Sequence, residues 1–274
     1  MPELPEVETV RRGLAALLVG RTFVRVQVRR RDLRRPLSGD FAKRLVGRRI
    51  TAVRRRAKYL QVVCQDGTVL LVHLGMSGRL NFLRWPPPPR RPHDHVNFTF
   101  DDGGTLRFND ARRFGLMDLT DLAGLAQHPL LRDLGPEPLG PDCTPAMLSA
   151  ALAGKATPIK AALLDQRVVA GLGNIYVCEA LYRAGVSPLR PAHTLTGSRA
   201  DRLVPEIRAV LEEAIAAGGS TLRDYVQASG ELGRFQAQFR VYDREGEPCR
   251  RCGKPIKRIV QSGRSTFYCS RCQK

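Results

Sequence analysis

The chain opens with MPELPEVETVRRGLAALLVG, residues 1–20. Apolar side chains recur at helical spacing between Val7 and Leu18, which predicts a helix that begins at Pro5 and stops near Gly20. Proline suits the first turn of a helix, and acidic residues suit the positive end of the helix dipole. The fold therefore starts with one amphipathic helix.

The same stretch also carries residues that could take part in catalysis. Proline at position 2 makes Met1 a target for removal, and its loss would leave Pro2 with a free secondary amine. An α-amino group titrates near pH ~7.7–8.0, so part of it is neutral at physiological pH and can attack carbonyl-like carbons. The carboxylates of Glu3 and Glu6 lie close by in sequence and could move protons. A plain helix start explains the same residues without chemistry, and the opening alone does not decide between the two interpretations.

A region of short apolar, alternating or β-branched runs follows the helix. Six of them predict strands: 23–28, 50–53, 59–63, 69–74, 96–100 and 106–108. Gly67 and the cluster at 101–104 are turn signals between them. Many short strands with tight turns predict an antiparallel sandwich or barrel.

After a proline- and glycine-rich stretch at 135–141 the pattern becomes helical. Thr144 followed by Pro145 is a helix cap with a first-turn proline. The expected helices cover 145–153, 158–166, 174–184, 199–217 and 220–228, with a tight turn at 171–174. Strand-like runs return at 239–242 and 266–268.

Four of the seven cysteines are clustered at the C-terminal end of the sequence. Cys249 and Cys252 form one CxxC pair, and Cys269 and Cys272 form a second pair after sixteen intervening residues. This spacing is typical of a tetrahedral four-thiolate zinc site, with a redox pair as the alternative. Because all four ligands are thiolates, no coordination position stays open for water, and we expect one structural Zn²⁺ that holds a small β-hairpin together.

The formal net charge of +19 and a sequence pI near 10.5 make nucleic acid the simplest partner. Basic residues concentrate in residues 1–134 and 234–274, while the middle of the chain is nearly neutral. The sequence has no signal peptide and no run of 18 apolar residues, so we expect no membrane span and a cytoplasmic protein.

Three further segments of the sequence carry residues suited to binding DNA and extruding a base. Lys58 follows a basic run at the start of an apolar strand, where it could line a cleft. The turn at 73–79 has Met76 at its tip, and an apolar wedge inserted into a base stack uses such a residue. The turn at 109–115 offers Arg112 to read a base edge and Phe114 to stack. Together these side chains supply what base extrusion needs.

In this order along nearly the whole chain, the motifs resemble the bacterial formamidopyrimidine-DNA glycosylase family. The resemblance is carried by residues 2–8, Lys58, 73–78, 109–115, 171–176 and the C-terminal finger. The sister branch, endonuclease VIII, is similar in architecture but usually has glycine where Leu4 stands here. The resemblance implies an α+β fold with three domains. The first is an N-terminal helix with an antiparallel β-sandwich (1–134), and a linker (135–145) connects it to a helix-two-turn-helix domain (146–233). The third is a zinc-finger β-hairpin (234–274).

The resemblance also implies roles for individual residues. Pro2 would be the nucleophile that attacks C1′ of the damaged nucleotide, and Glu3 the acid/base that protonates the sugar ring oxygen. Glu6 would support the site, Lys58 would act in β-elimination, and Arg264 would grip phosphate and assist δ-elimination.

Further residues match the DNA contacts of the family. Met76, Arg112 and Phe114 would fill the space left by the extruded base. Backbone contacts are expected from His93, Arg113, Lys155, Lys160, Asn174 and Tyr242. The stretch before Lys160 varies in length and charge, so Lys155 is the weakest match. Thr221 and Tyr225 fall in the segment that precedes the loop over the flipped base, and they are candidates only.

The resulting hypothesis is a monomeric, bifunctional DNA glycosylase and abasic-site lyase of base excision repair. It would remove 8-oxoguanine and formamidopyrimidines from duplex DNA, cleave the strand by β,δ-elimination, and associate with the bacterial nucleoid. Two alternatives stay open: a glycosylase for oxidised pyrimidines like endonuclease VIII, and a non-catalytic zinc-finger DNA-binding protein.

Overall fold

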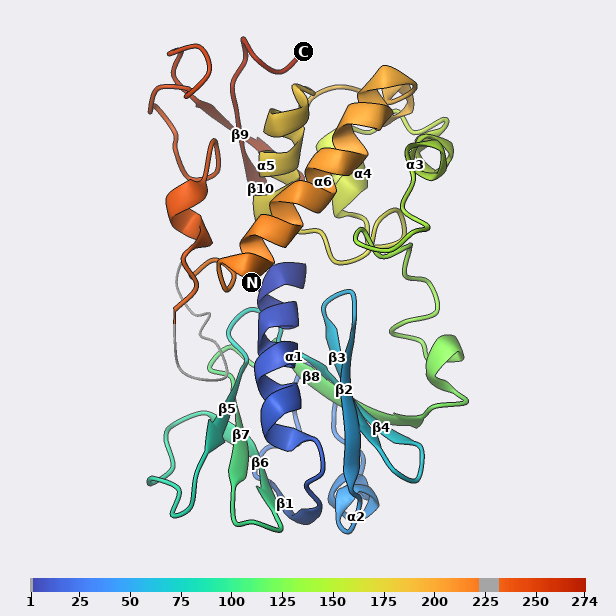
Figure 1. Ribbon diagram of the computed structural model, residues 1–274, viewed down its shortest axis with the longest axis vertical. Coiled ribbons are helices and arrows are strands. Elements are labelled where there is room, and N and C mark those ends of the chain that lie inside the picture. The colour runs from blue at the N-terminus through green and yellow to red at the C-terminus, as the bar shows by residue number, and fades with distance from the viewer. Residues whose placement is uncertain (1, 222–231) are drawn as a thin grey trace. The chain divides into compact units, whose positions relative to one another are not determined.

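The computed structural model describes residues 2–221 and 232–274 (Figure 1). Its described residues fall into two compact units. The first, here called the sandwich unit, spans Met1–Arg132 and Gly218–Arg234, and the second, the helical unit, spans Asp133–Ala217 and Phe235–Lys274. The helical unit includes the four-cysteine segment, and the finer division at 134, 145 and 233 stays a prediction. Within the described ranges, no helix has the length and apolar character needed to cross a membrane.

The sandwich unit begins with the expected helix, α1 (Leu4–Leu18). Glu3 is its N-cap and forms a capping box with Glu6, whose side chain accepts the Glu3 backbone N–H at 2.9 Å. One face of α1 buries Val7, Val10, Leu14 and Leu18 in the core. The helical periodicity of the opening stretch is therefore confirmed.

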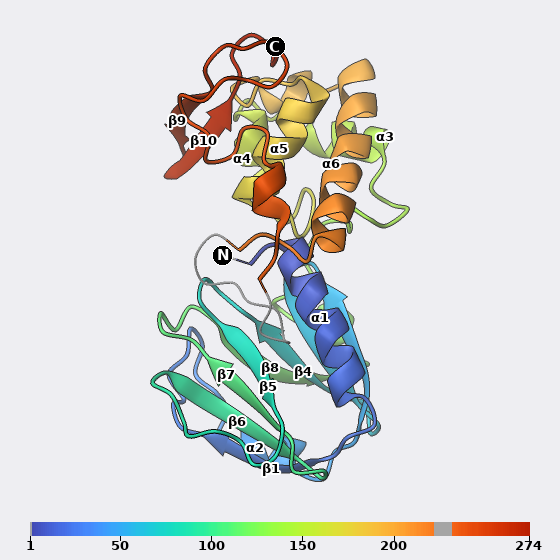
Figure 2. The same cartoon turned by 60° about the vertical axis from the view of Figure 1, so that its left-hand side comes forward.

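Two four-stranded antiparallel sheets make up the rest of this unit, so the sandwich prediction is confirmed (Figure 1). One sheet has the order β1 (Phe23–Val28), β6 (Asp94–Phe100), β7 (Thr105–Asn109) and β5 (Arg79–Leu83), and Figure 2 shows β6, β7 and β5 side by side. The other has the order β2 (Ile50–Arg56), β3 (Tyr59–Cys64), β4 (Thr68–His73) and β8 (Leu116–Asp121). The short α2 (Phe41–Leu45), β5 and β8 are additions that the sequence patterns did not predict.

Both sheets and α1 share one hydrophobic core. Helix α1 is also tied to β2 by Glu8, whose carboxylate accepts hydrogen bonds from Arg11, Arg12 and Arg55 at 2.9–3.1 Å. Burial alone would raise the pKa of Glu8, but the three guanidinium groups outweigh it and lower this pKa. Glu8 therefore does more than open the helix: it fixes α1 against strand β2.

The helical unit contains α3 (Pro145–Leu152), α4 (Ile159–Leu164), α5 (Asn174–Ala184) and α6 (Ser198–Ala216), which confirms four of the five expected helices. Short 3-10 turns occur at Leu125–Gln127 in the sandwich unit and at Ala192–Thr194 and Phe235–Gln238 in the helical unit. The fifth expected helix, 220–228, falls mostly outside the described residues.

The C-terminal segment forms the expected hairpin, β9 (Lys257–Gln261) and β10 (Arg264–Tyr268), and β10 lies against α5 (Figure 2). The strand expected at 239–242 was wrong. Instead of joining a sheet, the backbone N–H groups of Arg240, Val241 and Tyr242 all donate to the carboxylate of Glu179 on α5, at 2.8–3.0 Å. Glu179 is fully buried, so this carboxylate dictates the path of the segment.

Replacing Glu179 by alanine should lower the free energy of unfolding by about 3 kcal/mol or more, because several buried N–H groups would lose their acceptor. Glu212 on α6 is exposed and provides a matched control: Glu212→Ala should stay within about 0.5 kcal/mol of the parent. Urea unfolding followed by circular dichroism measures both. Equal stabilities for the two variants would contradict a structural role for the buried carboxylate.

Candidate active site and nucleic-acid interface

Two acidic side chains beside Pro2 are almost fully buried, Glu3 at 3% and Glu6 at 2% exposure. Glu6 uses both oxygens, because Oε2 accepts the Glu3 N–H and Oε1 accepts the Ser220 N–H at 2.8 Å. Glu6 therefore connects the start of α1 to residues 218–221 of the same unit. Burying carboxylates is costly unless they are hydrogen-bonded, and here backbone N–H groups satisfy Glu3 and both oxygens of Glu6, so the two acids are held buried beside Pro2.

Residues on either side of 222–231 are held together. Ser220 and Arg234 form an antiparallel β-bridge, and the Thr221 hydroxyl accepts the Gly233 N–H at 2.8 Å. A Cβ on Gly233 would collide with the carbonyl of Gly219, so only glycine fits there. The other candidate of this segment, Tyr225, lies outside the described residues.

Lys58 lies in the tight turn between β2 and β3 and is only 6% exposed. The preceding Ala57 has a left-handed backbone with φ +52°, and its carbonyl accepts a hydrogen bond from Arg55 at 3.0 Å. His73, on the neighbouring strand, has its pKa lowered to about 4, first by burial and then by the positive charges of Lys58 and Arg34. The His73 ring therefore stays neutral near Lys58 and accepts the Gly75 N–H at 3.0 Å.

This neutral histidine predicts an acid-sensitive fold. Between pH 6.5 and about 4 the unfolded chain binds a proton at His73 that the folded chain does not, so stability falls as the pH falls through this window. The loss attributable to His73 is at most about 3.5 kcal/mol, from about 1.4 kcal/mol for each pKa unit. Unfolding free energies measured at pH 7 and pH 4 should differ less in His73→Gln than in the parent. An unchanged pH dependence would contradict the assignment.

The turns that carry Met76 and Arg112 lie side by side in the sandwich unit. A Cβ on Gly75, whose φ is +64°, would collide with the backbone of Phe114 and Gly115. The Ser77 hydroxyl donates to Asp110 at 2.5 Å and accepts the Arg112 N–H at 3.1 Å. Asp110 is fully buried, and its second oxygen accepts the Gly115 N–H at 2.8 Å. This network fixes the two turns against each other.

The three side chains expected to fill an emptied base site therefore come from adjacent turns. Met76 is half-buried and Phe114 is 44% exposed, so both side chains are accessible at the ends of these turns. The Arg112 guanidinium lies 5.0 Å from the centre of the Phe114 ring, in a cation–π arrangement. His93 is exposed near the same turn, and its carbonyl accepts the Asp110 N–H at 3.1 Å.

Two of the expected DNA contacts, Arg113 and Lys155, already interact with carboxylates of the chain. Arg113 donates to Asp32 at 2.6 Å, and Asp32 also pairs with Arg30. DNA would have to compete with that carboxylate for Arg113. Lys155 is exposed in the connection between α3 and α4, and its carbonyl accepts the His193 N–H at 2.9 Å.

In the helical unit, three expected residues meet at Ser265 on β10. Lys160 is fully buried, and its ammonium donates to the Ser265 carbonyl at 3.0 Å and to the Thr266 hydroxyl at 2.7 Å. The Asn174 amide donates to the same carbonyl at 2.9 Å, and the exposed Arg264 is the preceding residue. Lys160 and Asn174 therefore brace the hairpin that presents Arg264.

Tyr242 is half-buried in a row of aromatic rings in the same unit. Its ring centre lies 5.5 Å from that of Phe239 and 5.1 Å from that of Phe267, both in edge-to-face geometry. Because its backbone N–H is bound by Glu179, the position of Tyr242 is fixed from two sides.

The four cysteines converge as their spacing predicted, with all ligand sulfurs within 4.8 Å of one another. The Cys252 and Cys269 sulfurs are 3.5 Å apart and those of Cys249 and Cys272 are 3.9 Å apart, close to the roughly 3.8 Å edge of a tetrahedron with ~2.3 Å Zn–S bonds. The Tyr182 hydroxyl lies 3.3 Å from the Cys249 sulfur. The geometry therefore fits one structural zinc ion with four thiolate ligands.

Sequence reasoning missed the residues that hold the site in shape. Ser77 and Asp110 are far apart in the chain, and nothing in either turn marks them as partners. The sequence did contain a signal for Glu179, because it is the one carboxylate in the otherwise largely apolar helix NIYVCEALYRA. A lone acid in a buried helix needs a partner, and that requirement could have identified it.

Comparison with known families agrees with these geometries. Residues 1–117 match the formamidopyrimidine-DNA glycosylase N-terminal domain, and residues 134–226 match the helix-two-turn-helix domain of the same enzyme. Residues 246–274 match a zinc finger found in formamidopyrimidine-DNA glycosylase and isoleucyl-tRNA synthetase.

Whole-chain relatives are close. A formamidopyrimidine-DNA glycosylase of Rhodospirillum centenum is 60% identical, and one of Beijerinckia indica is 58% identical, each with full coverage of both chains. The solved MutM (Fpg) protein of Thermus thermophilus is 43% identical with a TM-score of 0.89, over 99% of this chain and 98% of that one. A Lactococcus lactis Fpg mutant solved with Fapy-dG-containing DNA is 36% identical with a TM-score of 0.93 and full coverage of both.

Proposed function

The chain belongs to the formamidopyrimidine-DNA glycosylase family, and from this premise we propose that it is a bifunctional DNA glycosylase and abasic-site lyase of base excision repair. Its substrates are oxidised purines in duplex DNA, namely 8-oxoguanine and formamidopyrimidines. The observation that carries the proposal is the pair of buried carboxylates, Glu3 and Glu6, beside Pro2. An N-terminal amine next to a buried acid has the two groups that covalent base excision requires.

The chemistry starts once Met1 is removed. The Pro2 nitrogen attacks C1′, the glycosidic bond breaks with its electron pair going to the base, and Glu3 protonates the ring oxygen as the sugar opens. The resulting iminium ion acidifies the C2′ proton, and loss of that proton expels the 3′ phosphate by β-elimination, with Lys58 assisting. A second elimination releases the 5′ phosphate, with Arg264 on the phosphate, and leaves a one-nucleotide gap with phosphate at both ends.

Glu6 acts as a support in this scheme. Its two oxygens fix the Glu3 backbone and the Ser220 backbone, so it positions both the acid/base and residues 218–221. Glutamine at this position could offer only one acceptor, and its amide would face an N–H donor.

The adjacent turns of the sandwich unit serve base extrusion. Met76, Arg112 and Phe114 fill the space of the extruded nucleotide, with Arg112 facing the orphaned cytosine. The Ser77–Asp110 contact keeps the turns together, so these side chains enter the duplex as one group. Damaged pairs cost less to open, which adds selectivity.

DNA backbone contacts come from His93, Arg113, Lys155, Asn174 and Tyr242, and Lys160 contributes by bracing Arg264 from behind. The enzyme acts as a monomer on chromosomal DNA in the bacterial cytoplasm. Because basic residues supply the affinity, DNA binding weakens steeply with salt.

Release of the damaged base tests the substrate assignment. Duplexes with 8-oxoguanine opposite cytosine should be processed faster than duplexes with thymine glycol. A similar solved Lactococcus lactis Fpg holds DNA with an oxidised pyrimidine, which keeps pyrimidine lesions as the second candidate. A strong preference for thymine glycol would reject the oxidised-purine assignment, and no release of any damaged base would reject the glycosylase.

A further inference from the structure

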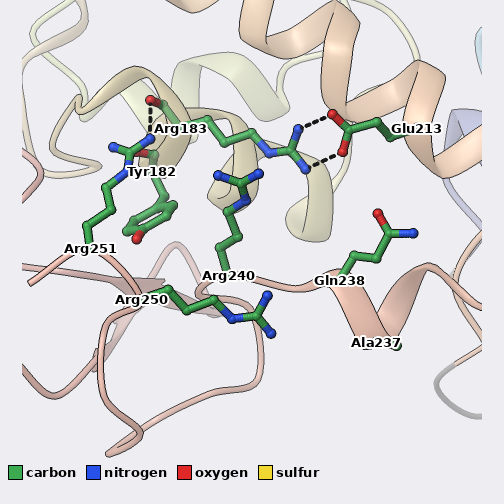
Figure 3. A pocket seen from close by; sticks show the side chains of 8 residues that line it. All are labelled: Tyr182, Arg183, Glu213, Ala237, Gln238, Arg240, Arg250 and Arg251. Carbon is green, nitrogen blue, oxygen red and sulfur yellow. Dashed lines mark hydrogen bonds and ion pairs between the residues drawn. The ribbon is translucent and has the colours of Figure 1, made fainter. Parts of the chain in front are cut away.

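The helical unit contains a pocket of about 420 Å³ away from the residues assigned above (Figure 3). Eight residues line it: Tyr182, Arg183, Glu213, Ala237, Gln238, Arg240, Arg250 and Arg251. None of them belongs to the catalytic, zinc-binding or DNA-contact residues proposed above. Arg183 lies nine positions after Asn174 on α5, an axial rise of about 14 Å at 1.5 Å per residue, so the pocket is distinct from the Ser265 cluster.

The lining is strongly basic. Four arginines stand against one acid, Glu213, which gives a net charge of +3 (4 − 1). Glu213 is already neutralised, because its two oxygens are bound by the two terminal nitrogens of Arg183 at 2.8 Å each, as the dashed lines in Figure 3 show. The charge of Arg240 also helps to lower the pKa of Glu213, so this one acid faces two of the four guanidinium groups and the lining keeps a net positive charge.

Arg251 and Arg183 are fixed parts of the wall. Arg251 donates to the carbonyls of Tyr182 and Arg183 at 3.0 and 2.9 Å, and its guanidinium lies 4.7 Å from the centre of the Tyr182 ring. The side chain of Arg183 is 4% exposed, and its buried Nε finds no acceptor among the residues that the structure describes. The wall therefore contains a buried donor that has no partner among the described residues.

Arg240 and Arg250 complete the pocket with guanidinium groups for which the described part of the chain shows no hydrogen-bond acceptor. The position of Arg240 is set by its backbone, whose N–H is bound by the buried Glu179 carboxylate at 3.0 Å. Arg250 follows the zinc ligand Cys249 directly, so the metal site fixes its backbone. Both donors are presented by anchored segments and not by free loops.

We propose that this pocket is a second anion site of the chain, which binds a phosphate group through Arg240 and Arg250. The planar fork of a guanidinium matches two oxygens of a phosphate, and a concave basic surface concentrates the field on an anion. The phosphate comes either from the backbone of a nucleic acid or from a free oligophosphate. The proposal does not depend on the glycosylase function.

Calorimetric titration of the zinc-loaded full chain with inorganic pyrophosphate tests the site. The double variant Arg240→Ala/Arg250→Ala should bind pyrophosphate about tenfold more weakly or worse, because charge-assisted hydrogen bonds are lost. Lys43→Ala/Arg44→Ala removes the same charge from exposed positions of α2 and should change the affinity less than about twofold. Zinc content and circular dichroism verify that the variants are folded, and Arg250→Ala alone should give part of the loss.

Salt dependence of binding to an undamaged duplex separates the two phosphate sources. If the pocket holds nucleic-acid backbone, the slope of log affinity against log salt should fall by about one to two units in the Arg240/Arg250 variant and not in the control. A weakened pyrophosphate affinity with an unchanged DNA slope assigns the site to a free oligophosphate. Equal losses in both double variants, or no saturable pyrophosphate binding by the parent, would overturn the proposal.

Discussion

A chain that keeps any residue in front of Pro2 should form no borohydride-stable adduct with damaged DNA. An additional residue converts the Pro2 amine into an amide, which has no nucleophilic lone pair, while every side chain of the site stays in place. Base release and strand cleavage should fall by roughly a thousandfold or more, the scale on which an essential nucleophile contributes. Trapping with borohydride on an 8-oxoguanine duplex measures the adduct, and gel analysis measures cleavage.

DNA binding provides the control for this experiment. The blocked chain should bind an abasic-site analogue about as well as the processed chain, because phosphate contacts supply most of the affinity. Pro2→Gly keeps a free amine but replaces the secondary by a primary one, and it should reduce trapping greatly without weakening binding. Full activity of the blocked chain would show that another group is the nucleophile.

Removing zinc should have the second large effect. A four-thiolate zinc site contributes roughly 10–16 kcal/mol to the folding of small zinc modules, so loss of the ion should unfold the β9–β10 hairpin. That hairpin carries the Ser265 carbonyl that binds Lys160 and Asn174, and it presents Arg264. Cys252→Ser, or exhaustive chelation, should therefore weaken DNA binding by about a hundredfold or more.

A matched control is available in Cys143, which is buried in the helical unit outside the metal cluster. Cys143→Ala should keep one zinc per chain, measured by atomic absorption, and should retain DNA binding. If Cys252→Ser lost its zinc yet bound damaged duplex like the parent, the finger would not be part of the DNA interface.

Periodicity was sufficient for the elements whose own side chains bury a continuous face. Helix α5 and strand β1 have the residues that sequence patterns indicated, and the ends of α1, α6 and β3 differ from the predicted ones by one or two residues. Strand β5 was not predicted, although Arg79 to Phe82 alternate polar and apolar side chains, because the run is short and only one of its five residues is buried. The segment 239–242 alternates like a strand, but the buried Glu179 captures its backbone donors, and no local pattern contains that information.

The candidate site shows the same division between local and distant information. The residue types at Pro2, Glu3, Lys58 and the cysteines carry their chemistry in the sequence itself. Their supports come from elsewhere in the chain: Ser220 for Glu6, and Asp110 for the Ser77 turn. The family resemblance implied a DNA-backbone contact for Lys160, whereas in the structure its burial directs the ammonium to Ser265. Such roles follow from tertiary packing, and residue type alone does not predict them.

The central claim is that the Pro2 amine forms the covalent bond to damaged DNA. Mass spectrometry of the proteolysed borohydride adduct tests it most directly, because it identifies both the N-terminal residue and the atom that carries the sugar. We expect a peptide that begins at Pro2, lacks Met1 and bears the reduced sugar on the Pro2 nitrogen. An adduct on Lys58, or an adduct on a chain that still begins with Met1, would contradict the claim.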